Sequence, residues 1–123
     1  MKKLLSSNIE NLREKQLRGL KWTVKHAYHG SDAYRKKLDD LNLKPNDIQS
    51  MDDLQRLPFT SPKDLSDGYP FPLLSVPIEN VSRIHTSSGT TGKRKVLCYT
   101  KKDIHDWIKF FTRCFEFAGL TAE

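Results

Sequence analysis

HTSSGTTGKRK, from His85 to Lys95, is the stretch that decides how the second half of the chain can fold. It contains three threonines, two serines and two glycines, and it closes on three cations. No apolar side chain is present, so the stretch cannot pack against a core. Short runs rich in β-branched and apolar residues flank it and predict strands over 81–85 and 96–99. The pattern therefore predicts two strands joined by a polar loop that contains glycine.

The segment after the second strand predicts a long amphipathic helix. Thr100 is a suitable N-cap with Asp103 three positions on, and Gly119 is suited to end the helix. An isolated two-stranded sheet is too small to cover the apolar stripe of such a helix. We therefore expect the helix to pack on a sheet that lies mostly beyond this chain. The stripe consists of Ile104, Trp107, Ile108, Phe111, Cys114, Phe115 and Ala118.

The first half of the chain predicts helices. Apolar residues recur at helical spacing over 8–29, and Gly30 is a natural stop. Ser31 or Asp32 can cap a second helix. The apolar positions of that second helix are Ala33, Tyr34, Leu38 and Leu41.

Two further short helical segments are expected before the strands. One opens at Ser50, with Asp53 in the capping-box position, and the other opens at Thr60. Three prolines make 69–77 an extended connector. The fold class is thus α/β, of α+β type. We divide the chain into a helical segment, 1–80, and a strand–Ser/Thr/Gly loop–strand–helix unit, 81–123, both parts of one incomplete domain.

The composition is that of a soluble folded protein. The 123 residues are 37% hydrophobic and 29% charged, which fits one small domain or a piece of a larger one. The net charge of +6 is compatible with nucleic acid, phosphorylated ligands or an acidic surface. Two cysteines without metal-type spacing favour a reducing compartment. No secretion signal or membrane-spanning stretch is recognisable, so we expect the cytoplasm.

The loop has the chemistry of a phosphate-binding turn. Glycines bring backbone N–H groups close to a ligand, hydroxyls add donors without bulk, and a lysine at the exit adds a positive charge. The pattern differs from the P-loop, which needs G-x-x-x-x-G-K-[ST] before a helix, and from the dinucleotide fingerprint. A plain Ser/Thr/Gly hairpin loop without a ligand is the alternative.

The sequence from Ser87 to Lys93, SSGTTGK, resembles the phosphate-binding signature of the adenylate-forming enzymes. The flanking residues narrow the resemblance to the phenylacetate–CoA ligase family, of which only the N-terminal part is expected here. It covers most of the chain from Tyr34 onward. The flanks that carry it are LPFT (57–60), KDL (63–65), DGYPF (67–71), VSRIH (81–85) and YTKKDI (99–104).

The resemblance implies an activity and a site. Such enzymes use ATP and Mg²⁺ to convert an aryl-acetic acid into an acyl-adenylate, and coenzyme A then displaces AMP. Lys93 and Thr90 are implied as the catalytic pair, and Mg²⁺ as held through phosphates, with no protein metal ligand. The residues implied to bind the phosphates are Ser87, Ser88, Gly89, Thr90, Thr91, Gly92 and Lys93.

Two departures from the family pattern bear on function. Arg94 stands where the superfamily has proline or a small apolar residue, which makes the loop exit looser and more cationic. The chain is also several times shorter than these enzymes, so we expect it to be inactive alone. The partner is then the remainder of a ligase, or a protein that covers the face of Trp107, Phe111 and Phe115. A homodimer of the intact enzyme is left open.

The sequence leaves other functions and other residues to consider. A non-catalytic subunit that binds nucleotide and a protein partner is one alternative, and a small basic nucleic-acid-binding module is another, although neither nucleic acid nor membrane is our expected partner. His85 has a structural and a phosphate-orienting interpretation in equal measure. His26 and His29 lack a third metal ligand. We expect a packing role for Cys98, Cys114, Trp22 and Trp107, and a solvated position for His105.

Overall fold

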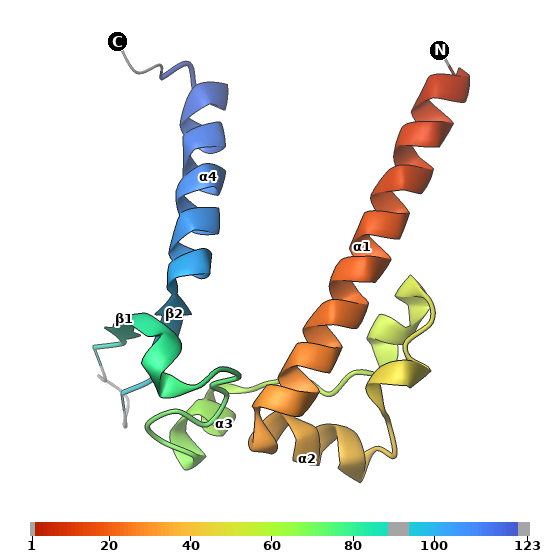
Figure 1. The fold of residues 1–123 in the computed structure, drawn as a ribbon. Coiled ribbons are helices and arrows are strands. Elements are labelled where there is room, and N and C mark those ends of the chain that lie inside the picture. The colour runs from red at the N-terminus through yellow and green to blue at the C-terminus, as the bar shows by residue number, and fades with distance from the viewer. Residues whose placement is uncertain (1, 89–93, 121–123) are drawn as a thin grey trace.

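Two long helices rise from a base of short elements in the computed structural model, which describes residues 2–88 and 94–120 (Figure 1). The long helices are α1 (Lys2–Gly30) and α4 (Lys101–Phe117), at opposite ends of the chain. The elements of the base are α2 (Asp32–Asp40), η1 (Pro45–Asp47), η2 (Met51–Arg56), α3 (Pro62–Asp67), η3 (Ile78–Asn80), β1 (Val81–Thr86) and β2 (Val96–Thr100).

The core lies where the C-terminal half of α1 meets α2 and the turns that follow. Leu20 and Tyr28 of α1 and Tyr34 of α2 pack against its buried residues. Because these positions recur at helical spacing, both helices turn one apolar face toward the same volume. The buried residues of this cluster are Val24, Leu38, Leu43 and Ile48.

A close contact fixes the junction between α1 and the extended connector. A Cβ at Gly30 would lie 2.1 Å from the carbonyl oxygen of Ser75, so no larger residue fits there without a backbone shift. Ser31 is buried and caps α2, since its Oγ accepts from the N–H of Tyr34 at 3.3 Å. The same hydroxyl donates to the carbonyl of Pro72 at 3.2 Å. The helical part is thereby tied to the segment that leads into β1.

Among the described elements, η2, α3 and α4 each start with a capping box. Ser50 with Asp53 opens η2 and Thr100 opens α4, as the sequence predicts. The start of α3 is one residue later than expected: Ser61, and not Thr60, is the N-cap. The reason is that Asp64 Oδ2 accepts from both the backbone N–H and the hydroxyl of Ser61, at 2.6 and 2.9 Å.

The two strands pair as the sequence predicts. β1 and β2 form an antiparallel hairpin in which Ile84 lies opposite Cys98 and Thr86 opposite Val96. The register shifts between Val81 and Arg83. Helix α4 follows β2 directly and extends away from the hairpin (Figure 1).

Several packing expectations were wrong. Cys114 is exposed, Trp22 is 63% exposed and Leu41, the C-cap of α2, is 54% exposed. The aromatic residues of α4 are also largely exposed, because the described residues supply no layer that covers them. Helix α1 begins at Lys2 rather than near residue 8, since no helix-breaking residue interrupts 2–8.

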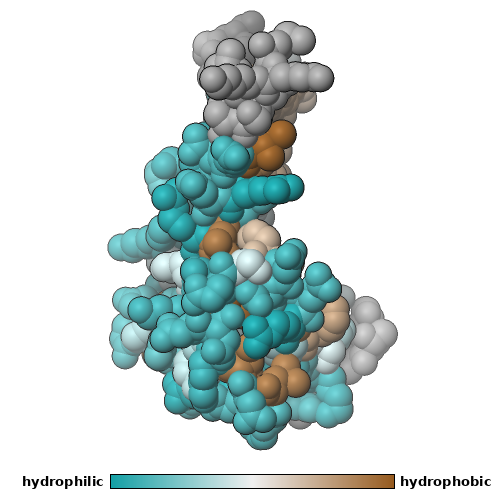
Figure 2. All heavy atoms as spheres, turned by 90° about the vertical axis from the view of Figure 1, so that its right-hand side faces the viewer, coloured by the Kyte–Doolittle hydropathy of each residue, from teal (hydrophilic) through white to brown (hydrophobic). Residues whose placement is uncertain are grey.

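Figure 2 shows the α1 side as mostly hydrophilic with separate hydrophobic patches.

Among the described residues, no helix combines the length and the apolar character that crossing a bilayer requires.

Candidate phosphate-binding site

The candidate site is the loop that joins the two strands of the hairpin. The N–H of Ser87 donates to the carbonyl of Lys95 at 3.0 Å, and the N–H of Lys95 donates to Ser87 Oγ at 3.0 Å. This pair prolongs the ladder beyond Thr86 and Val96, so the loop proper runs over 88–94. The Ser87 hydroxyl accepts one hydrogen bond within the chain, and its O–H can still donate to a ligand.

Only some of the predicted phosphate-binding residues are among those that the structure describes. Ser87 and Ser88 lie at the end of the first strand, and Arg94 follows on the return path, with both Ser88 and Arg94 exposed. Gly89, Thr90, Thr91, Gly92 and Lys93 lie outside the described residues. What the described residues provide is the neck of the loop, with an exposed hydroxyl on one side and an exposed guanidinium on the other.

A group of three rings in contact joins this hairpin to α4. His85 lies 4.9 Å from the ring of Tyr99 and 6.0 Å from the ring of Trp107, centroid to centroid. Tyr99 and Trp107 stack at 5.6 Å with an angle of 15° between their planes. His85 is half-buried and therefore packs as a structural residue, which favours the structural one of its two interpretations. Sequence spacing could not show this, because the three rings come from three different elements.

A mostly apolar cavity of about 290 Å³ lies between the connector and the base of the hairpin. Phe71 and Leu73 line it from the connector, Val96 and Cys98 from β2, and His26 from α1. Burial raises the pKa of the Cys98 thiol, so the thiol stays neutral near pH 7. A neutral thiol in apolar surroundings agrees with the packing role expected for Cys98 and not with that of a nucleophile.

A shallow hollow of about 460 Å³ adjoins this cavity through His26 and Ser75. Lys25 and His29 line it from α1, and Trp22 stacks on His26 there at 4.9 Å with an angle of 6°. Within the ranges 2–88 and 94–120, no group of three or more His, Cys, Asp or Glu residues is placed to hold a metal ion. The pair His26 and His29 thus has no third ligand among those residues.

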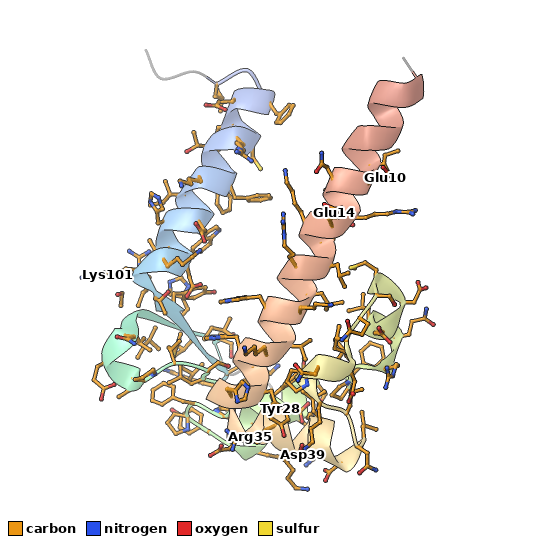
Figure 3. The ribbon with its side chains drawn as sticks, turned by 45° about the vertical axis from the view of Figure 1, so that its right-hand side comes forward. Glu10, Glu14, Tyr28, Arg35, Asp39 and Lys101 are labelled. Atoms are coloured by element: carbon orange, nitrogen blue, oxygen red, sulfur yellow. The ribbon has the colours of Figure 1, made fainter. Side chains whose placement is uncertain are left out.

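A group of polar and charged contacts lies in the base, away from the loop. Figure 3 shows Tyr28, Arg35 and Asp39 gathered where α1 meets α2, whereas Lys101 lies at the start of α4. The Tyr28 hydroxyl donates to Asp39 at 2.9 Å, and Arg35 donates to the carbonyl of Tyr28 at 2.9 Å. Hydrogen bonds from Lys44 and Tyr28 lower the pKa of Asp39. These contacts close the C-terminal end of α1 onto α2 and are structural.

An ion pair connects α2 to α3. Lys37 Nζ lies 2.7 Å from Asp64 Oδ1 and also donates to the carbonyl of Phe59 at 2.9 Å. The hydrogen bond from Lys37, with those from Ser61, lowers the pKa of Asp64 to about 2. The N-terminus of α3 is thereby held against α2.

The arrangement of elements is similar to one part of a solved ligase. A crystal structure of 2-hydroxyisobutyryl-CoA ligase with 2-HIB-AMP and CoA in the thioesterification state matches 76% of this chain and 21% of its own, with a TM-score of 0.67 and 24% identity. The same ligase in the postadenylation state with 2-HIB-AMP matches with a TM-score of 0.64 and 22% identity. These likenesses confirm the expected fold class, an α/β part of a larger domain.

Sequence comparison narrows the class to one family. The phenylacetate-coenzyme A ligase of Escherichia coli is 43% identical over 114 residues, and that of Aromatoleum evansii is 46% identical over 110 residues. The enzyme of Thermus thermophilus is 43% identical over 110 residues. These matches cover 93%, 89% and 89% of this chain. No family model matches the sequence. The curated relatives of the chain are thus phenylacetate–coenzyme A ligases, and the chain spans about a quarter of the length of those it matches.

Proposed function

We propose that the chain is the phosphate-binding part of an AMP-forming acid–coenzyme A ligase that activates an aryl-acetic acid. One observation carries the proposal: the sequence SSGTTGK is set on a hairpin whose neck is closed by Ser87 and Lys95, in a chain 43% identical to a phenylacetate–coenzyme A ligase. In this reaction a carboxylate oxygen attacks the α-phosphorus of ATP and pyrophosphate leaves. The thiol of coenzyme A then attacks the acyl carbon of the adenylate and displaces AMP.

The loop residues have separate roles in this proposal. Lys93 stabilises the negative charge that develops on the departing pyrophosphate, and Thr90 donates its hydroxyl to a phosphate oxygen. Ser88 and Thr91 supply further hydroxyl donors. Gly89 and Gly92 allow the backbone to approach the phosphates. Ser87 contributes mainly by closing the neck of the loop, because its oxygen already accepts from Lys95.

The cofactors follow from the same chemistry. The exposed hydroxyl of Ser88 and the exposed guanidinium of Arg94 fit a polyphosphate, since both donate hydrogen bonds to phosphate oxygens. Mg²⁺, when bound, would neutralise phosphate charge, and we assign it no protein ligand. Coenzyme A and the aromatic acid are expected to contact parts of the ligase other than these residues. A cytoplasmic location and a dimeric enzyme belong to the same proposal.

The proposal is tested by nucleotide binding to the purified chain. A fluorescent ATP analogue should bind and be displaced by pyrophosphate, and Lys93→Ala should weaken binding at least about tenfold, as for loss of a charge-assisted contact. Lys101→Ala is the matched control, because Lys101 lies at the start of α4 (Figure 3). Equal binding by both variants would count against the proposed site. Thioester formation by the chain alone would overturn our expectation that it is inactive without the rest of the enzyme.

A second candidate function, binding of single-stranded nucleic acid, is favoured by one observation. Trp22 was expected in the core but is 63% exposed, and Lys25 lines the same hollow. Helix α1 carries seven basic and two acidic residues. Exposed aromatic rings beside basic side chains can stack bases. Affinity for an oligonucleotide that persists at physiological salt and is lost in Trp22→Ala would support this function over the first.

A further inference from the structure

The cavity between the connector and the base of the hairpin is walled by several separate parts of this chain. Its lining comes from α1, α3, the connector and β2, with Asp103 from the first turn of α4 (Figure 1). The volume of the cavity is about 290 Å³. An apolar protein cavity of about 150 Å³ is enough to hold benzene. The space therefore admits an aromatic ring with a short side chain.

The interior of this cavity offers little polarity, although polar side chains form part of its wall. The Ser75 hydroxyl donates to the carbonyl of Leu73 at 3.2 Å, and the Thr100 hydroxyl donates to Asp103 Oδ2 at 2.7 Å. Burial raises the pKa of the Cys98 thiol, which is therefore uncharged near pH 7. An apolar group in the cavity does not deprive these side chains of their partners, so the cavity favours an apolar ligand body.

The charges around the cavity differ between its two sides. On the α4 side, the Asp103 carboxylate accepts from the N–H and the hydroxyl of Thr100 at 2.8 and 2.7 Å. On the α1 side, His26 leads into the adjoining shallow hollow, which Lys25 and His29 also line. Of the described residues around that hollow, none is acidic. A ligand with one negative group should place it beside Lys25 and away from Asp103, because opposite charges attract and like charges repel.

The shape and the charges together define a class of ligand. We propose that the cavity and the hollow form a binding site for a small aromatic carboxylic acid. Its ring lies in the cavity beside Phe71, and its carboxylate faces Lys25 in the hollow. Trp22, which is 63% exposed and stacks on His26 at 4.9 Å, forms part of the wall of the hollow. These walls exist whatever reaction the protein serves, so the site does not depend on the proposed function.

Two cysteines of the same molecule make this site measurable. Cys98 lines the cavity, whereas Cys114 is exposed on α4. Alkylation of the folded 123-residue chain with iodoacetamide, followed by mass spectrometry of the two peptides, gives a rate for each thiol. The probe is phenylacetate. At saturation it should slow the alkylation of Cys98 at least about threefold and leave the rate of Cys114 unchanged, because the bound ring covers only Cys98.

The role of charge is tested on the ligand and on the protein. Phenylacetamide has the same ring without the charge, and its half-protecting concentration for Cys98 should be at least about threefold higher, as for loss of an exposed ionic contact. Phenethylamine, a cation, should protect least. Lys25→Gln should raise the half-protecting concentration of phenylacetate at least about threefold. Lys21→Gln is the matched control on α1, because Lys21 donates to Gln49 at 3.0 Å, and it should change that concentration less than about twofold.

A variant that fills the cavity gives an independent measurement. Cys98→Phe places a ring in the cavity and should abolish the heat of phenylacetate binding in calorimetry. If this variant does not fold, the alkylation rates and Lys25→Gln decide the question. The proposal is overturned if phenylacetate at about 10 mM, which would nearly saturate a site of millimolar affinity, does not protect Cys98. It is also overturned if both cysteines are slowed alike, or if phenethylamine protects Cys98 as well as phenylacetate does.

Discussion

Ser87 and Lys95 exchange two hydrogen bonds at the neck of the candidate phosphate loop, each 3.0 Å long. One of them uses the Ser87 side chain as acceptor for the N–H of Lys95. Ser87→Ala removes this acceptor and leaves the other bond in place. We expect a loss of about 0.5–1.5 kcal/mol in the free energy of unfolding, as for a typical hydrogen bond. Urea denaturation followed by circular dichroism measures it.

The same substitution should affect nucleotide binding less than Lys93→Ala does. Ser87→Ala changes the neck and not the proposed phosphate cation, so we expect a fall in ATP affinity of only a few fold. Ser87→Thr keeps the hydroxyl and serves as the control that restores both values. If Ser87→Ala abolishes ATP binding while stability is unchanged, Ser87 is a direct ligand and its assignment to the neck is wrong.

Arg94 offers a second test of the loop, because proline or a small apolar residue stands there in the superfamily that the sequence resembles. Arg94→Pro removes an exposed cation and fixes the backbone φ of the loop exit. We expect the free energy of unfolding to rise by about 0.4–1 kcal/mol, through a less flexible unfolded chain. The salt dependence of ATP affinity should become shallower. Arg94→Gln, which removes the charge alone, should change the salt dependence without the gain in stability.

Two leucines three residues apart, Leu38 and Leu41, test whether the core forms as described. Leu38 is fully buried in the contact between α1 and α2, whereas Leu41 is 54% exposed. Leu38→Ala should lower the free energy of unfolding by about 2–5 kcal/mol, because it leaves a cavity. Leu41→Ala should change it by no more than about 0.5 kcal/mol. Equal effects in denaturant melts would mean that the chain does not form this core in solution.

These two leucines also show why the sequence predicted some features and not others. Both fit the apolar spacing of α2, but the helix ends at Asp40 and Leu41 is its C-cap. The sequence does not define the last residue of a helix to better than one or two positions, so it could not show that Leu41 lies outside the helical face that packs on the core. Local chemistry was predictable: the caps at Ser50 and Thr100 and the pairing of the two strands depend only on nearby residues. Contacts between distant segments were not.

The exposed positions of Cys114 and Trp22 have the same origin. The spacing of apolar residues shows that a helix has an apolar face. Whether that face is buried depends on a second layer that packs against it, and the helix's own sequence says nothing about that layer. The contact of the His85 ring with the stacked rings of Tyr99 and Trp107 likewise depends on how a strand pair and a helix meet. The family signature on the loop was recognisable because loop chemistry requires particular residue types at fixed spacing. The roles of its individual residues stay predictions.

Replacing each of two glycines of α1 by alanine should change the free energy of unfolding in opposite directions. A Cβ at Gly30 would lie 2.1 Å from the Ser75 carbonyl oxygen, whereas a Cβ at Gly19 meets nothing within 4 Å. Gly30→Ala forces the connector away and should cost about 1–3 kcal/mol in the free energy of unfolding. Gly19→Ala should stabilise the helix by about 0.5–1 kcal/mol. Thermal melts of both variants measure the two effects, and a stabilised Gly30→Ala would contradict the contact between α1 and the connector.

The ion pair between Lys37 and Asp64 should make the free energy of unfolding depend on pH in the acid range. Hydrogen bonds from Lys37 and Ser61 lower the pKa of Asp64 to about 2, below its value of about 3.9 in an unfolded chain. A carboxyl whose pKa is lower in the folded state adds stability above its unfolded pKa and loses it as the pH falls through the folded value. The contribution of Asp64 is therefore present above about pH 4 and lost between about pH 4 and pH 2.

Asp64→Asn removes this titration and isolates its effect. The difference in unfolding free energy between the unmodified chain and Asp64→Asn should be constant above pH 4 and should shrink steadily toward pH 2. Asp40→Asn is the matched control, because Asp40 pairs with Lys36 in an exposed position on α2 itself. Urea denaturation at half-unit pH intervals measures each difference. If the Asp64→Asn difference is independent of pH across this range, Lys37 does not hold the Asp64 carboxylate in solution, and the start of α3 is not fixed to α2 by charge.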